Sequence, residues 1–192
     1  SMREIVKTFL AAKVPVIVDD DATVFDSNAI LLYLADKTGQ FLPPATPADR
    51  GALLSWLMFV ASGVGPYSGQ AVHFRHYAPE PIPYAKSRYV FEAKRHFGIV
   101  EARLAQHRYM LGDAFTIVDM ALWGWSRLVP YVIGDDAWAA FPHVKRHLDE
   151  IDARPAVGAA GATGTGSAST ARSPQRPPEW AAPPPWGGTG HE

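Results

Sequence analysis

Hydrophobic and polar positions in the first forty residues follow two different periods. Two short β-branched runs occupy residues 14–18 and 23–25, and residues 19–22, three of them aspartates, separate the runs. Acidic turn residues between two such runs predict a β-hairpin. A helical period follows directly, because Asp26 and Ser27 both suit an N-cap and Gly39 suits a C-cap. The apolar positions between these caps are Ile30, Leu31, Leu34 and Ala35.

From Pro47 onward the chain shows the helical period alone. The first of these helices carries a broad apolar stripe, and Gly63, Gly65 and Pro66 should bend or end it. A long helix is predicted over residues 83–107. The stripe of the first helix consists of Leu53, Leu54, Leu57, Met58 and Ala61.

Two further helices are predicted, over residues 120–129 and from Pro142 onward. Thr116 and Asp119 precede the first of them at the spacing of a capping box. Asp119 is therefore assigned a structural role and not a catalytic one.

Composition changes abruptly after Pro155, where Gly, Ala, Ser, Thr and Pro dominate. Such a segment buries too little apolar surface to offset the entropy lost on ordering. The predicted organisation has a first unit over residues 1–42, which opens with a short helix over 1–12, an all-helical unit over 46–154, and a disordered tail over 156–192.

Charge and cysteine content narrow the range of functions. The formal net charge is −1 and the chain holds no cysteine. A near-neutral balance gives no electrostatic reason to expect nucleic acid or an anionic membrane as partner. No disulfide, thiol nucleophile or thiolate metal site can be proposed, so any thiol must come from a ligand. No run approaches the ~20 apolar residues of a membrane span and no signal-peptide pattern is present, so we expect a cytoplasmic protein.

Candidate binding chemistry lies at the two ends of the predicted hairpin. Pro15 forces Val14 into extended geometry, in which its backbone N–H and C=O can pair with a peptide-like ligand. The helix start at Asp26 and Ser27 offers free N–H groups and a hydroxyl to an anion, and a carboxylate to an ammonium group. Residues alone leave two interpretations open, a holder for a zwitterion or an ordinary hairpin with a capped helix.

The phrases KVPVIVD and VFDSNAILLYLADKTG resemble the glutathione-binding half of the glutathione transferase family. The resemblance implies a cis-Pro at Pro15 and a Val14 backbone paired with the cysteinyl part of glutathione. It also implies that Asp26 and Ser27 hold the γ-glutamyl end, and that Lys13 meets the glycyl carboxylate.

The phrases LSWLMFVASGVGPYSGQAVHF and APEPIPYAKSRYVFEAKRH are similar to the bacterial Nu-class branch, whose members are glutathione-dependent disulfide reductases. The family reaction is conjugation of an electrophile or reduction of a disulfide small molecule, with glutathione as co-substrate and no metal. The resemblance further implies a homodimer formed through residues 63–77, residues 83–107 and the glutathione-binding unit, a ligand contact from Arg95, and a substrate pocket that includes Tyr67 and Phe74.

The predicted fold is therefore α+β, mostly α, with a partial thioredoxin-like unit of a hairpin and one helix before an all-helical glutathione transferase domain. The family normally begins with a strand, a helix and another strand, and the turn after the first strand carries the residue that activates the thiol. This turn has no counterpart in the sequence, so we expect an N-terminally truncated member and assign no catalytic residue. Two alternatives stay open, a non-catalytic binding or regulatory module and an inactive gene fragment.

Several charged or ligating pairs are interpreted as surface features. His143 and His147 lie one helical turn apart, but without a third ligand we expect an exposed pair and no metal. Glu92 is spaced from Arg88 and from Arg95 for exposed ion pairs. A solvated ionic face is the alternative to a ligand-binding role for Arg95.

Overall fold

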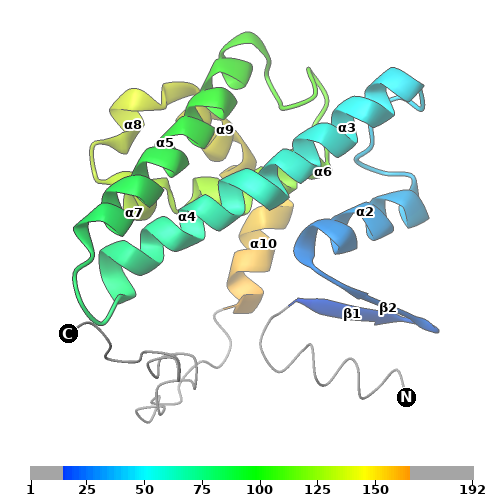
Figure 1. Cartoon of the computed structure of the whole chain (residues 1–192). Helices are drawn as coiled ribbons and strands as arrows, with labels where there is room; N and C mark the ends of the chain where they lie inside the picture. The colour runs from blue at the N-terminus through cyan, green and yellow to red at the C-terminus, as the bar shows by residue number, and fades with distance from the viewer. Residues whose placement is uncertain (1–14, 165–192) are drawn as a thin grey trace. The chain divides into compact units, whose positions relative to one another are not determined.

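The computed structural model describes residues 15–164 (Figure 1). The chain divides into two units, Ser1–Ala153 and Arg154–Glu192. The predicted helix over residues 1–12, and Lys13 and Val14 with it, lie outside the described residues.

The first described elements are an antiparallel hairpin and the helix after it. β1 (Val16–Asp19) pairs with β2 (Ala22–Phe25) in the register Val16 to Phe25. Asp20 in the two-residue turn has φ +53°, a left-handed conformation that Asp tolerates better than most residues. α2 (Ser27–Thr38) ends at Gly39, whose φ of +66° allows its N–H to bond the Ala35 carbonyl. The predicted hairpin and the predicted helix stop at Gly39 are both present.

Polar contacts tie α2 to β1. The Tyr33 hydroxyl donates to Asp19 Oδ2 at 2.8 Å, and the Lys37 ammonium donates to the same oxygen. The Lys37 and Tyr33 donors together hold the pKa of the Asp19 carboxyl below its usual range. The helix is therefore fixed against the hairpin, and its N-terminus has a defined position.

A helical rod of four segments follows: α3 (Pro47–Phe59), η1 (Val60–Val64), α4 (Gly65–Val72) and η2 (His73–Tyr77). The segments η1 and η2 are π-helical turns. The helix does not end at Gly63, Gly65 or Pro66, since the chain stays helical through them. A Cβ at Gly63 would lie 2.5 Å from Cδ2 of the buried His96 ring, so the backbone passes too close for any side chain there. Gly63 makes this close approach to the His96 ring from within the π-helical turn η1.

The remaining helices of the first unit pack against the rod or against one another. They are α5 (Pro83–Gln106), α6 (Ile117–Ser126), α7 (Val129–Ile133), α8 (Ala137–Ala140) and α9 (Pro142–Asp152). α5 packs along α4 and η1 (Figure 1). The core that they enclose contains fully buried residues of α3, η1, α5, α6 and α9. Among them are Leu53, Leu57, Val64, Phe97, Val100, Leu122 and Val144. Buried apolar residues recur at helical spacing on α5 and α9, namely Ala93, Phe97, Val100 and Leu104 on the first and Val144, Leu148 and Ile151 on the second.

Asp119 is the polar centre of this helical domain. Its side chain is fully buried, and both contacts of the capping box with Thr116 are present. Oδ2 accepts the Thr116 N–H at 2.8 Å, while Oδ1 accepts the Met110 N–H at 2.9 Å. His147 Nε2 also lies 2.9 Å from Oδ1. One carboxylate therefore joins the loop before α6, the start of α6 and the middle of α9.

The prediction of an exposed histidine pair is wrong for one partner. His147 is fully buried beside Asp119, whereas His143 is nearly half exposed and lies 2.6 Å from Glu101. The two imidazoles contact different carboxylates and do not face a common ligand.

Glu101 also supplies the cap that α9 lacks. Phe141, at the N-cap position of this helix, makes no side-chain capping bond. The N–H groups of His143 and Val144 donate instead to the Glu101 carboxylate of α5 at 2.9–3.0 Å. The start of α9 is thus fixed by a residue about forty positions earlier in the chain.

α10 (Pro155–Gly164) belongs to the second unit. Residues 156–164, which composition placed in a disordered tail, are helical here. Residues 165–192 lie outside the described residues, so the prediction for that part of the tail stays a prediction. The predicted division between residues 42 and 46 falls inside the first unit.

Candidate functional site

The junction of β2 and α2 carries an unusual backbone conformation. Asp26 follows the last residue of β2 with φ +71° and ψ 128°, values that a non-glycine residue rarely adopts. Its Oδ1 accepts the N–H groups of Asn28 at 2.9 Å and Ala29 at 3.2 Å, which makes Asp26 the N-cap of α2. Backbone strain of this kind concentrates at binding and catalytic sites. The second carboxylate oxygen has no hydrogen-bond partner among the described residues.

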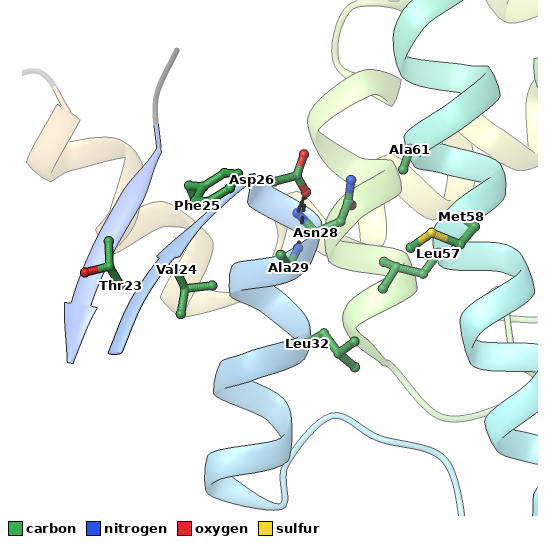
Figure 2. A pocket seen from close by; sticks show the side chains of 10 residues that line it. All are labelled: Thr23, Val24, Phe25, Asp26, Asn28, Ala29, Leu32, Leu57, Met58 and Ala61. Atoms are coloured by element: carbon green, nitrogen blue, oxygen red, sulfur yellow. Dashed lines mark hydrogen bonds between the residues drawn. The ribbon is translucent and has the colours of Figure 1, made fainter. Parts of the chain in front are cut away.

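A cavity of about 580 Å³ opens at this junction (Figure 2). One wall comes from β2 and α2, with the capped helix start at Asp26 and the amide of Asn28 as its main polar groups. The other wall comes from the rod. The lining residues are Thr23, Val24, Phe25, Asp26, Asn28, Ala29 and Leu32 on the first wall, and Leu57, Met58 and Ala61 on the second. The cavity is therefore apolar with polar groups gathered at the helix N-terminus.

Only part of the predicted glutathione contact set is described. Pro15 is exposed and directly precedes β1. Ser27 is the exposed first residue of α2, next to the cap, and its hydroxyl makes no hydrogen bond to another described residue. Asp26 lines the cavity, whereas Pro15 and Ser27 do not.

Arg95 is engaged elsewhere, on α5. Its Nε donates to Glu92 Oε2 at 2.8 Å, and Arg88 donates to the other carboxylate oxygen of Glu92. Both predicted pairs form, but Glu92 is buried and only the arginines reach solvent, so the expectation of a fully exposed ionic face is wrong. The Arg95 and Arg88 donors hold the pKa of the Glu92 carboxyl below its usual range. Arg95 does not line the cavity at Asp26.

Tyr67 and Phe74 belong to an aromatic cluster between α4, η2 and α5. Tyr67 stacks on His96 at 4.9 Å between ring centroids, and Phe74 stacks on Tyr89 at 5.3 Å. Neither side chain lines the cavity described above. The structure thus groups these two predicted pocket residues with each other and apart from Asp26.

Sequence reasoning missed the second wall of the cavity. Met58 and Ala61 were placed on the core stripe of their helix, yet both line the cavity and Met58 is half exposed. The stripe is wider than one core-facing side of a helix needs, and this excess width was the available signal. Asn28 was also missed, although it lies in the same short phrase as Asp26 and Ser27.

No group of three or more His, Cys, Asp or Glu side chains within residues 15–164 is arranged to hold a metal ion. None of the helices described there has both the length and the apolar character needed to cross a membrane. The expectations of no metal and no membrane partner stay predictions.

The geometry suits a ligand with a charged, hydrogen-bonding end and an apolar part. A helix N-terminus attracts an anionic group, the free Asp26 oxygen suits an ammonium group, and the apolar walls favour a less polar substituent. The fold and the site together describe a hairpin-and-helix ligand module joined to a helical domain.

Comparison with known proteins identifies the family. Residues 3–36 match the model of the glutathione S-transferase N-terminal domain, and residues 78–155 match that of the C-terminal domain. The chain is 39% identical over 162 residues to the disulfide-bond oxidoreductase YfcG of Escherichia coli, covering 77% of this chain and 71% of YfcG. It is 43% identical over 142 residues to the disulfide-bond oxidoreductase YghU of the same organism, covering 70% of this chain and 48% of YghU.

A solved structure agrees with this assignment. A glutathione transferase from Burkholderia graminis, with two glutathione molecules bound per subunit, superimposes with a TM-score of 0.77 at 35% identity. The match covers 85% of this chain and 72% of that structure. The chain therefore belongs to the glutathione S-transferase family, and its relatives include the Nu-class-like oxidoreductases. The predicted fold class, a thioredoxin-like first part followed by a helical domain, is confirmed.

Proposed function

We propose that the chain binds glutathione at the capped N-terminus of α2, with the γ-glutamyl end at Asp26 and Ser27. The observation that carries this proposal is the strained Asp26, whose carboxylate opens into the cavity with one oxygen free of hydrogen bonds to the described residues. The α-carboxylate of the ligand would meet the helix N-terminus and its ammonium group would meet Asp26. The backbone of Val14 beside Pro15, and Lys13, remain the predicted contacts for the cysteinyl and glycyl parts.

The reaction we propose is disulfide reduction by thiol–disulfide exchange. The chain has no cysteine, so the attacking sulfur is that of bound glutathione. Its thiolate attacks one sulfur of a small-molecule disulfide, a mixed disulfide forms, and the other sulfur leaves as thiolate. The names of YfcG and YghU as disulfide-bond oxidoreductases support this reaction over conjugation of an electrophile. No residue is assigned as activator of the thiol.

Paired substitutions of Asp26 test the binding site. Asp26→Asn keeps an N-cap residue that tolerates a positive φ but removes the charge, whereas Asp26→Ala removes both. Calorimetric titration should show about ten- to hundredfold weaker glutathione binding in Asp26→Asn, because a charged hydrogen bond contributes roughly 1.5–3 kcal/mol. Asp36→Asn, on the same helix but outside the cavity, is the matched control. Unchanged affinity in Asp26→Asn would overturn the assignment.

Two measurements distinguish an inactive fragment, a binding or regulatory module, and an enzyme. An inactive fragment binds no glutathione, a binding or regulatory module binds it without turnover, and an enzyme also reduces a model disulfide. Calorimetry followed by a coupled disulfide-reduction assay on the full chain separates the three. The proposed metal-free reaction requires the reduction rate to be unchanged by a chelator.

We also propose that the protein forms a homodimer in the cytoplasm. Tyr84 and Phe91 are 78% and 61% exposed and lie two turns apart on the long helix α5. Large exposed apolar side chains gathered on one helix are typical of interfaces. Light scattering behind size exclusion should give a dimer mass, and replacing both aromatic residues with serine should give the monomer. Cell fractionation tests the compartment.

A further inference from the structure

The three methionines that the structure describes differ sharply in access to solvent. Met110 is fully buried and Met120 is partly buried against the core, whereas Met58 is 49% exposed. With no cysteine in the chain, methionine thioethers are its readily oxidised sulfurs. Oxidation of a thioether follows its exposure, because the oxidant must reach the sulfur. Met58 is therefore the described residue most open to this chemistry.

Met58 also lies at a position where a more polar side chain would disturb the apolar wall of the cavity. It lies on the rod wall of the cavity with Leu57 and Ala61, facing apolar residues of β2 and α2 (Figure 2). Methionine sulfoxide is polar and carries a strong hydrogen-bond acceptor. The rod wall offers it no donor side chain, so a ligand that packs between this wall and the Asn28 amide across the cavity would desolvate the sulfoxide oxygen without a compensating bond from the wall.

We propose that Met58 is an oxidative modification site, through which hydroperoxides lower the affinity of the cavity for its ligand. In the step, the thioether sulfur attacks one peroxide oxygen and the O–O bond breaks. The sulfur gains that oxygen and loses two electrons, the proton of the transferred oxygen passes to the leaving oxygen, and the rest of the peroxide departs as water or an alcohol. The identity of the ligand rests on the proposed function, whereas the selectivity for Met58 does not.

The first test maps the modification. The full chain is treated with limiting hydrogen peroxide and digested, and sulfoxide is measured at each methionine by mass spectrometry. We expect Met58 to be oxidised about tenfold faster than Met110, as its exposure requires. Equal rates at Met58 and either of the two more buried methionines would overturn the proposal.

The second test measures binding before and after oxidation. Glutathione affinity should fall about fivefold in the oxidised wild type and not in Met58→Leu, which keeps the apolar wall without the sulfur. Treatment with methionine sulfoxide reductases should restore it. An unchanged affinity of the oxidised protein, or the same loss in Met58→Leu, would overturn the proposal.

A second probe separates a failure of this proposal from a failure of the proposed glutathione binding. If the untreated protein does not bind glutathione, anilinonaphthalene sulfonate, a fluorescent dye that enters apolar cavities, replaces it as probe. Dye fluorescence should then fall on oxidation of the wild type and stay constant in Met58→Leu. Constant fluorescence in both would refute the effect of Met58 oxidation on the cavity and so overturn the proposal.

Discussion

Replacing Asp119 with alanine should remove a large part of the stability of the helical domain. The carboxylate is fully buried and accepts backbone N–H groups from Met110 and Thr116, with the Thr116 hydroxyl and His147 Nε2 as further partners. Alanine would leave at least two buried backbone donors and the imidazole without an acceptor. Each buried donor left unsatisfied costs about 1–3 kcal/mol, so the expected loss is about 4 kcal/mol. Domains have total stabilities of about 5–15 kcal/mol.

Asp119→Asn provides a milder step in the same series. The amide keeps one acceptor oxygen but turns an N–H donor toward a group that itself donates, so about half of the loss is expected, roughly 2 kcal/mol. Asp149→Ala is the matched control, because Asp149 is exposed and its side chain pairs with Lys145 alone among residues 15–164. An exposed pair at this spacing contributes about 0.3–0.5 kcal/mol.

Urea unfolding followed by far-ultraviolet circular dichroism measures all three variants. The expected order of destabilisation is Asp119→Ala, Asp119→Asn and then Asp149→Ala. A loss below about 1 kcal/mol for Asp119→Ala, within the range of ordinary surface changes, would refute the account of Asp119 as the polar centre. If the alanine variant does not fold, the gap between Asp119→Asn and Asp149→Ala decides the question.

Three further predictions concern other contacts of this domain. Glu101→Gln should destabilise the protein by about 1 kcal/mol in urea unfolding, since it weakens the cap at the start of α9 and the contact with His143; an unchanged midpoint would contradict the capping role. The pKa of Glu92 is lowered in the folded state by two arginines, so its contribution is complete above its ordinary value of 4.5 and is lost as the pH falls through the lower folded value. Urea midpoints should accordingly differ between wild type and Glu92→Gln above pH 4.5 and converge in stronger acid, and a constant difference would argue against the linkage. Gly63→Ala should cost about 1–3 kcal/mol through its clash with His96, and the double variant with His96→Ala should recover part of that loss.

Features set by short-range signals were predictable from the sequence. Asp26 before a helical period, Gly39 after it and Thr116 three positions before Asp119 each mark a helix end through their own chemistry, and each is found there. The paired runs of the hairpin form in the same way. Such signals depend only on neighbours in the chain, so one sequence is sufficient to interpret them.

Features decided by distant partners were not predictable. The burial of His147 depends on Asp119, which lies on another helix, and the burial of Glu92 depends on how α5 packs. The side of α3 that meets α2 decides whether Met58 enters the core or lines the cavity, and the periodicity of α3 alone contains no information on that partner. The predicted Arg95, Tyr67 and Phe74 contacts rested on family resemblance, and the described cavity at Asp26 includes none of them.

The two π-turns of the rod have a consequence for sequence comparison and engineering. A π-turn accommodates one extra residue within an α-helix. Deleting one residue between 60 and 64 would therefore convert this turn to a regular α-helical turn and leave the downstream helix face nearly in place. Tyr67 would stay on the side of the rod that stacks on His96, and Phe74 on the side that stacks on Tyr89. In this part of the chain a one-residue gap in an alignment signifies the loss of a π-turn, whereas the same gap in the regular helix α5 would turn the residues after it by about 100°.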